Sequence, residues 1–306
     1  MTPSLKNRYR GALLGLACGD AVGTTVEFSA RGSFAPVTEM VGGGPFGLKP
    51  GQWTDDTSMA LCLAESLLTK GAFDAADQMV RYLNWWKWGY MSSTGNCFDI
   101  GMTVSAALEK FSVNGNPFSG STDPMTGGNG SLMRLVPAVL FAYPDMPLVL
   151  EYAADSSRTT HGAPEAVECC QLFAALISAA LAGHDKEQLF ENVHFRPTQP
   201  KLVELSSGAF TQKAERDIRG SGYCVASLEA ALWCFFNTDS FEEAVLRAVN
   251  LGDDADTTGA IVGQLAGAFY GVETIPQSWL DQLSLSEDIT QMADKLHERS
   301  AAMPTG

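Results

Sequence analysis

Two rows of glycines with a four-residue period constrain this chain more than any other feature. The rows are Gly11, Gly15, Gly19 and Gly23, and Gly259, Gly263, Gly267 and Gly271. An interior glycine costs a helix about 1 kcal/mol relative to alanine, so a whole row needs a compensating contact. Because residues four apart form a ridge on one helix face, we expect two helices whose backbones touch along these rows. The alternative is that some of these glycines end helices or form turns.

The same packing predicts where Glu27 lies. If the two helices run antiparallel, the next position on the first row after Gly23 is Glu27. That position falls near the N-terminal end of the second helix, which carries Asp254 and Asp256. The sequence therefore predicts that Glu27 joins these two residues in an acidic cluster.

The rest of the chain also favours helices. Apolar patterns of helical length cover residues 56–69, 103–111, 164–181, 225–236 and 257–270, and most end at Gly or Asn. Strand-like alternation is scarce, and no linker-like tract divides the 306 residues. We expect an all-α fold, a compact orthogonal helical bundle that forms a single domain over 1–306.

Charge and cysteine usage narrow the partners and the compartment. The net charge of −15 argues against nucleic acid or an anionic membrane as the main partner, but not against a small phosphate-bearing ligand. The seven cysteines show no CxxC spacing, and the first residues lack the apolar segment of a signal peptide. The longest apolar run, 169–183, is too short to span a bilayer. We expect a cytoplasmic protein with reduced thiols and take it to be a monomer.

Two acidic segments share a pattern. Residues 252–261 read GDDADTTGAI and residues 53–61 read WTDDTSMAL, so both place carboxylates and threonine hydroxyls at the start of an apolar helix. Taken singly, each is explained as a helix cap with extra surface acids, since anions in a first turn contribute about 0.3–1 kcal/mol each. Clusters this dense in an acidic chain instead favour a site for hard divalent cations, which bind oxygen ligands. The absence of a His and Cys cluster argues against zinc.

These segments resemble the ADP-ribosylglycohydrolase family, and most closely its bacterial dinitrogenase-reductase-activating type, an ADP-ribosyl-arginine hydrolase. The matching segments are 11–28 (GALLGLACGDAVGTTVEF), 50–61 (PGQWTDDTSMAL), 95–101 (GNCFDIG), 127–134 (GGNGSLMR), 158–165 (RTTHGAPE) and 249–271 (VNLGDDADTTGAIVGQLAGAFYG). They follow the family order over nearly the whole chain. The resemblance implies a compact all-α fold with a dinuclear Mg²⁺ or Mn²⁺ site in a cleft. It also implies hydrolysis of the bond between the anomeric carbon of ADP-ribose and an acceptor.

The resemblance also implies which residues form the metal site. The metal ligands carried over by motif are Thr54, Asp55, Asp56, Asp254, Asp256 and Thr257. Glu27 matches the family's acidic residue close to the metals, in agreement with the glycine rows. It is our first candidate for the catalytic proton transfer, because the acceptor must leave protonated. Asp99 is the second candidate.

The substrate contacts rest on weaker signals. TGGNGS at residues 126–131 predicts a glycine-rich turn that opens a helix, whose N–H groups can bind a pyrophosphate; without a P-loop ending, such a turn is more often a plain loop. The contacts implied by resemblance are Asn96, Gly128, Asn129, Gly130, Ser131, His161 and Tyr223. On its own, His161 is interpreted as structural, and Tyr223, the candidate adenine platform, as a core tyrosine.

Two departures from the family pattern bear on specificity. The arginine hydrolases have an Asp a few residues before Gly95-Asn96, where this chain has Ser93, and this weakens the inference of arginine specificity. The family often has Gly at the position of Asp253, so we expect Asp253 to lie outside the metal ligands.

The resulting hypothesis is removal of ADP-ribose from a modified acceptor, arginine on a protein being the first choice. The substrate is then an ADP-ribosylated protein or a small ADP-ribosyl compound, and ADP-ribose is a product. One alternative is hydrolysis of another ADP-ribosyl linkage, to serine, to nucleic acid or to a small metabolite. Another is a non-catalytic ADP-ribose-binding or structural member, in which lost ligands are expected; all six are present.

Overall fold

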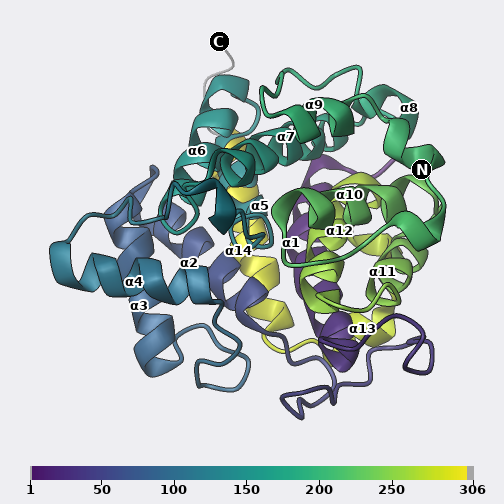
Figure 1. Ribbon diagram of the computed structural model, residues 1–306, viewed down its shortest axis with the longest axis horizontal. Coiled ribbons are helices and arrows are strands. Elements are labelled where there is room, and N and C mark those ends of the chain that lie inside the picture. The colour runs from purple at the N-terminus through teal and green to yellow at the C-terminus, as the bar shows by residue number, and fades with distance from the viewer. Residues whose placement is uncertain (1, 302–306) are drawn as a thin grey trace.

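The computed structural model describes residues 2–301, and the regular secondary structure of those residues is helical, with no strand among them (Figure 1). Met1 and residues 302–306, which belong to the expected 1–306 domain, lie outside the described residues. The α-helices are α1 (Leu5–Gly23), α2 (Asp55–Lys70), α3 (Ala75–Trp88), α4 (Met102–Asn114), α5 (Val136–Ala142), α6 (Met146–Arg158), α7 (Pro164–Leu181), α8 (Lys186–Leu189), α9 (Pro200–Ser206), α10 (Cys224–Phe236), α11 (Phe241–Val249), α12 (Ala255–Tyr270), α13 (Gln277–Gln282) and α14 (Ser286–Ala301). Short 3₁₀ turns cover Thr24–Val26, Pro124–Thr126, Ala209–Gln212, Glu215–Asp217 and Val272–Thr274. The expected all-α, single-domain architecture is confirmed.

All five helices expected from the apolar patterns are present as α2, α4, α7, α10 and α12. Glycine ends several of the helices for a clear reason. Gly71, Gly89 and Gly115 follow α2, α3 and α4 in the left-handed conformation, with φ of 68°, 66° and 71°. This conformation is cheap only for glycine, so the chain can turn sharply after the last helical carbonyls.

α1 and α12 pack against each other, antiparallel, along the two glycine rows. The facing pairs are Gly11 and Gly267, Gly15 and Gly263, and Gly19 and Gly259. A Cβ on Gly19 would lie 2.0 Å from the carbonyl oxygen of Gly259, so no residue larger than glycine fits while the backbones stay in place. The predicted contact is confirmed. Gly271, in contrast, is the C-cap of α12 with φ of 81°, as the alternative explanation allowed for part of a row.

This contact sets where the site can form. A Cβ on Gly23, the last residue of α1, would lie 2.4 Å from the Cα of Asp256. The end of α1 therefore meets the start of α12, and the 3₁₀ turn Thr24–Val26 carries Glu27 to the same place. In Figure 1, α2, α3 and α4 lie on one side of α1 and α14, α10 and α11 lie on the other, and α12 overlaps α1.

α7 is the most apolar long helix of the described chain. Its 18 residues have a mean hydropathy of 1.3, which is long and apolar enough to cross a membrane by length and composition alone. However, 78% of these residues are buried within the protein, as expected for a core helix. All seven cysteines are free thiols.

The glycine-rich segment does not open a helix as we expected. Turns follow Asn129, and α5 begins only at Val136. The reason is Pro137, which has no N–H to donate to the carbonyl of Met133. The side chain of Gln264 on α12 takes over: its Nε2 donates to Met133 O at 2.9 Å, and its Oε1 accepts from Val136 N at 2.8 Å.

Candidate metal centre and substrate cleft

The two acidic motifs meet at the facing N-termini of α2 and α12. Thr54 is the N-cap of α2 and Asp254 is the N-cap of α12. The Thr54 hydroxyl oxygen lies 3.2 Å from Asp256 Oδ2, and the Thr257 hydroxyl oxygen lies 3.5 Å from Asp56 Oδ2. The partial positive charge of both helix N-termini therefore acts on the same carboxylates.

A residue that the sequence analysis missed, Asp20 of α1, links the two motifs. Its Oδ1 accepts from Thr54 N and Thr54 Oγ1, both at 2.9 Å. Its Oδ2 accepts from Thr57 N at 3.0 Å and Thr57 Oγ1 at 2.6 Å. Asp20 thus caps α2 from another helix. Because a carboxylate offers about four lone-pair sites and all are used here, Asp20 organises the cluster rather than providing a free ligand.

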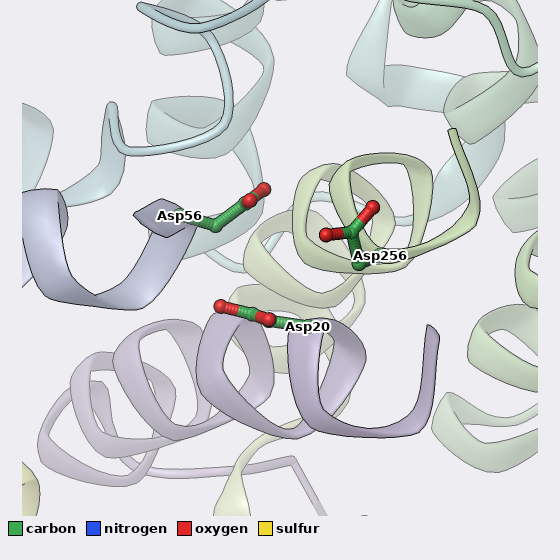
Figure 2. Close-up of side chains that lie close together, drawn as sticks. All are labelled: Asp20, Asp56 and Asp256. Atoms are coloured by element: carbon green, nitrogen blue, oxygen red, sulfur yellow. The ribbon is translucent and has the colours of Figure 1, made fainter. Parts of the chain in front are cut away.

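Five carboxylates converge into two adjoining groups that share Asp256. The first group is Asp20, Asp56 and Asp256, and Figure 2 shows these side chains directed toward one space from α1, α2 and α12. The second is Glu27, Asp99 and Asp256. In each group the oxygens lie within 4.8 Å of one another. The predicted approach of Glu27 to Asp256 is confirmed.

Within the cluster, three buried carboxylate oxygens lack any hydrogen-bond partner in the described protein. They are Oδ1 of Asp56, Oδ1 of Asp256 and Oε2 of Glu27. Buried charges are normally paired, hydrogen-bonded or bound to metal, so these atoms require a partner that the protein itself does not provide. Oxygen-rich, closely spaced and without His or Cys, the arrangement fits divalent cations of the Mg²⁺ class.

Electrostatics supports the same conclusion. Burial, followed by repulsion from neighbouring carboxylates, raises the pKa of Asp55, Asp56 and Asp256 well above the usual range. Burial and then the charge of Asp256 raise the pKa of Glu27 to about 12. Burial likewise raises the pKa of Asp99 to about 7. Without cations, the cluster therefore holds protons at neutral pH.

Backbone strain is concentrated around this cluster. Phe28, Asp99 and Asp253 have φ of 60°, 60° and 55°, in the left-handed region that is costly for residues other than glycine. The loops of Glu27 and Asp254 are joined by two backbone hydrogen bonds, Phe28 N to Asp253 O at 2.7 Å and Asp253 N to Ser29 O at 2.8 Å. Asp253 itself is exposed and belongs to neither carboxylate group. Its φ explains why glycine suits this position.

A cavity of about 550 Å³ opens above the cluster. Its lining residues are Glu27, Phe28, Asp55, Asp99, Ile100, Gly101, Met102, Thr103, Val104, Gly128, Asn129, Gly130, Met133, His161, Gly222, Asp254 and Thr257. The carboxylates form one part of the wall and the glycine-rich turn with His161 forms another, and the two parts meet where Asn129 Nδ2 donates to Asp254 Oδ2 at 2.6 Å. Thr54, Asp56 and Asp256 are buried and do not line the cavity.

Not every candidate substrate contact reaches this cavity. Tyr223 lines an adjoining cavity of about 510 Å³ that shares Thr103, Gly128 and Gly222 with the first. Ser131 is buried and accepts a hydrogen bond from the Ser157 hydroxyl at 2.8 Å, so it supports the turn from behind. Asn96 is exposed on its loop and lines neither cavity.

Asp20 can be recognised from its sequence context. It is the only charged residue between Gly11 and Gly23, inside an apolar and glycine-rich helix. A single carboxylate next to Gly19, on a helix that must be buried along its glycine row, indicates a buried acid with a specific partner. The partners themselves, Thr54 and Thr57, are not readable from that local pattern.

The sequence and the fold of this chain are similar to those of known proteins. The family model described as ADP-ribosylglycohydrolase matches residues 1–305. The chain is 45% identical to ADP-ribosylarginine hydrolase Tri1 of Pseudomonas putida (strain GB-1), over 96% of this chain and 79% of that one. It is 34% identical to the ADP-ribosyl-dinitrogen reductase glycohydrolase of Rhodospirillum rubrum, over 96% and 97% of the two chains. A solved structure, an ADP-ribosylglycohydrolase-related protein complex, superposes with a TM-score of 0.86 at 46% identity, over 97% of this chain and 99% of that chain.

Proposed function

The chain belongs to the ADP-ribosylglycohydrolase family, and from this premise we propose that it removes ADP-ribose from arginine side chains of modified proteins. It is an ADP-ribosyl hydrolase. The observation that carries the proposal is the pair of carboxylate groups sharing Asp256 at the base of a cavity large enough for a nucleotide-sized ligand. The identity of 45% and 42% to two proteins named ADP-ribosylarginine hydrolases supports arginine as the acceptor.

Two divalent cations, Mg²⁺ or Mn²⁺, complete the site in this proposal. The candidate ligands are Thr54, Asp55, Asp56, Asp254, Asp256 and Thr257, with Glu27 beside them. The unpartnered oxygens of Asp56, Asp256 and Glu27 support this assignment. Such cations, when bound, orient a substrate and supply a nucleophile by lowering the pKa of water.

The protein's own groups then handle substrate and protons. Water adds to the anomeric carbon and gives up a proton, the bond from that carbon to the arginine nitrogen breaks, and the nitrogen takes up a proton as the guanidine leaves. Asp99 and Glu27 both line the cavity and lie in one carboxylate group, so either can hold that proton.

The replacement of an acid by Ser93 has a structural explanation. The Ser93 hydroxyl donates to Trp53 O at 2.6 Å and accepts from Trp53 N at 3.2 Å, so Ser93 holds the segment that leads into α2. Any acidic contact with a guanidinium must come from elsewhere in the cavity. The carboxyl groups that line the cavity and can make such a contact are those of Glu27, Asp55, Asp99 and Asp254.

The remaining expectations fit the same function. A cytoplasmic monomer that acts on modified proteins, or on small ADP-ribosyl compounds, agrees with free cysteines and an acidic surface. The charge of −15 disfavours nucleic acid as the carrier of the modification, so serine is the main competing acceptor.

One assay separates the acceptors. We expect the protein to release ADP-ribose from an ADP-ribosyl-arginine protein with Mg²⁺ or Mn²⁺, and to lose this activity in EDTA. An ADP-ribosyl-serine peptide and an ADP-ribosylated DNA end serve as comparison substrates. Release from serine alone would overturn the arginine assignment, and metal-independent release would overturn the metal assignment.

A further inference from the structure

Arg134 is an unusual buried cation. Its side chain is fully buried, and among residues 2–301 no carboxylate forms an ion pair with it. Its guanidinium donates to neutral oxygens, Gly130 O at 3.0 Å and Thr160 Oγ1 at 2.7 Å, and lies over the ring of Tyr82 at 4.7 Å. In a chain with a net charge of −15, a buried arginine without an acidic partner creates a local positive potential that favours a bound anion.

The hydrogen bonds of Arg134 determine the tautomer of His161. A guanidinium can only donate, so Thr160 Oγ1 must accept from Arg134. Thr160 Oγ1 also lies 2.8 Å from His161 Nδ1. Within the described protein, this nitrogen is the only acceptor recorded for the Thr160 hydroxyl hydrogen. Nδ1 therefore accepts, and the ring hydrogen of a neutral His161 is on Nε2.

The Nε2 side of the ring faces the glycine-rich wall of the cavity. A Cβ on Gly130 would lie 2.8 Å from His161 Cε1, and one on Gly128 would lie 3.3 Å from Nε2. Both residues line the cavity together with His161. The two glycines therefore leave room for the ring, and the ring in turn reaches the cavity. Burial and the charge of Arg134 lower the pKa of His161 to about 3, which keeps the ring neutral at physiological pH.

We propose that Arg134, acting through the Thr160 hydroxyl, is a positioning residue that holds His161 as a neutral Nε2–H donor to a phosphate oxygen of ADP-ribose. The inference rests on the proposed function for the identity of the ligand, but the tautomer follows from the hydrogen bonds alone. A phosphate is favoured over a neutral oxygen because Arg134 places an unpaired positive charge behind the same wall.

Substitution of Thr160 tests the hydrogen-bond chain from Arg134 through the Thr160 hydroxyl to His161, here called the relay. Thr160→Val removes the hydroxyl at nearly constant volume, and Thr160→Ser keeps it as the matched control. In ¹⁵N-labelled protein, the His161 ring resonances should show the Nε2–H tautomer in the native and Ser forms, and a shift toward Nδ1–H in the Val form. With Mg²⁺ present, the Kd for ADP-ribose should rise about tenfold for Val, the loss typical of one hydrogen bond, and stay near the native value for Ser.

Substitution of His161 tests which nitrogen donates. The amide nitrogen of Gln occupies roughly the place of Nε2, and that of Asn the place of Nδ1. We expect His161→Gln to bind ADP-ribose within about threefold of the native Kd, and His161→Asn to bind at least about tenfold more weakly. Adenosine, which lacks phosphates, should bind both variants equally.

The outcomes distinguish this inference from the proposed function. An Nδ1–H tautomer in the native protein, or equal ADP-ribose binding by the Gln and Asn variants, would overturn the inference. Native protein that shows the Nε2–H tautomer but binds no ADP-ribose would leave the relay standing and overturn the ligand and the proposed function together.

Discussion

Two regions at the cavity have opposite electrostatic character: the carboxylate cluster, here called the acidic end, and His161 with the buried Arg134 behind it, here called the His161 end. At the acidic end, carboxylate oxygens of Asp56, Asp256 and Glu27 are buried and unpaired. At the other end, Arg134 is buried with only neutral hydrogen-bond acceptors, and His161 is held neutral. The protein does not neutralise one end with the other. In our proposals, the acidic end binds divalent cations and the His161 end binds a phosphate of the same substrate.

The largest expected effect comes from the carboxylate that both acidic groups share. Asp256→Asn should lower kcat/KM by about 10³-fold or more, because a bound metal contributes several kcal/mol to the stabilisation of the transition state. Calorimetric titration with Mn²⁺ should show little remaining binding, whereas the His161 tautomer should be unchanged. Asp253→Asn, at an exposed neighbouring acid, is the control. Strong Mn²⁺ binding by Asp256→Asn would contradict the assignment of Asp256 as a metal ligand, and a changed His161 tautomer would contradict the independence of the two ends.

A smaller effect is expected at Asp20, which holds the acidic end together. An Asn at this position can accept hydrogen bonds with one oxygen only, so donors of Thr54 or of Thr57 lose their partner. We expect a loss of about 2 kcal/mol in unfolding free energy and a 10–100-fold weaker affinity for Mn²⁺. Asp74→Asn is the control, since Asp74 caps α3 with one oxygen, Asn caps equally well, and the ion pair of the other oxygen with Lys70 lies at the surface and contributes at most about 1 kcal/mol. Equal effects of the two substitutions in urea unfolding would show that Asp20 is an ordinary cap.

The two ends should respond to pH in opposite directions in metal-free protein. The pKa of Asp99 is raised in the folded state to about 7, so its contribution to stability is present below pH 4 and is lost as pH rises through 7. The pKa of His161 is lowered to about 3, so the unfolded state binds the extra proton and stability is lost as pH falls below about 6.5. Each group can change stability by up to about 1.4 kcal/mol per pH unit.

Two variants separate these contributions. In EDTA, Asp99→Asn should reduce the loss of stability between pH 5 and about 8, and His161→Gln should reduce the loss below about pH 6. Urea unfolding of the native protein and both variants across this range measures both slopes. Changes in the same pH direction for the two variants would contradict the comparison.

The smallest effect is expected at Asp253. Glycine adopts its φ of 55° without strain but also gains freedom in the unfolded chain, so Asp253→Gly should change stability by less than about 1 kcal/mol. Because the side chain is exposed and screened, the affinity for Mn²⁺ should change by less than about twofold. A large loss of metal affinity would place Asp253 among the groups that act directly on the cations.

Much of the fold and part of the site were predictable because their signals are local. Apolar periodicity located α2, α4, α7, α10 and α12, since burial of one helix face depends on residue spacing alone. The approach of Glu27 to Asp256 also followed from the sequence, because the glycine rows predict close contact of two helices and the antiparallel direction places the end of α1 near the start of α12. The helix expected directly after the glycine-rich turn was wrong because Pro137 has no N–H for the carbonyl of Met133, and the side chain of Gln264, more than a hundred residues away, binds that carbonyl and Val136 N instead.

The sequence by itself determined that two glycine-lined helices meet and that acids gather at the starts of two others, because both facts follow from residue type and spacing. Only the tertiary structure decided which acids converge, that Asp20 caps α2, and that Tyr223 lines an adjoining cavity. It also decided that Arg134 has no carboxylate partner among residues 2–301. The physical reason is that the hydrogen bonds, ion pairs and pKa of a buried charged group depend on the residues that surround it in space. Those neighbours come from helices far apart in the chain, and no local pattern records them.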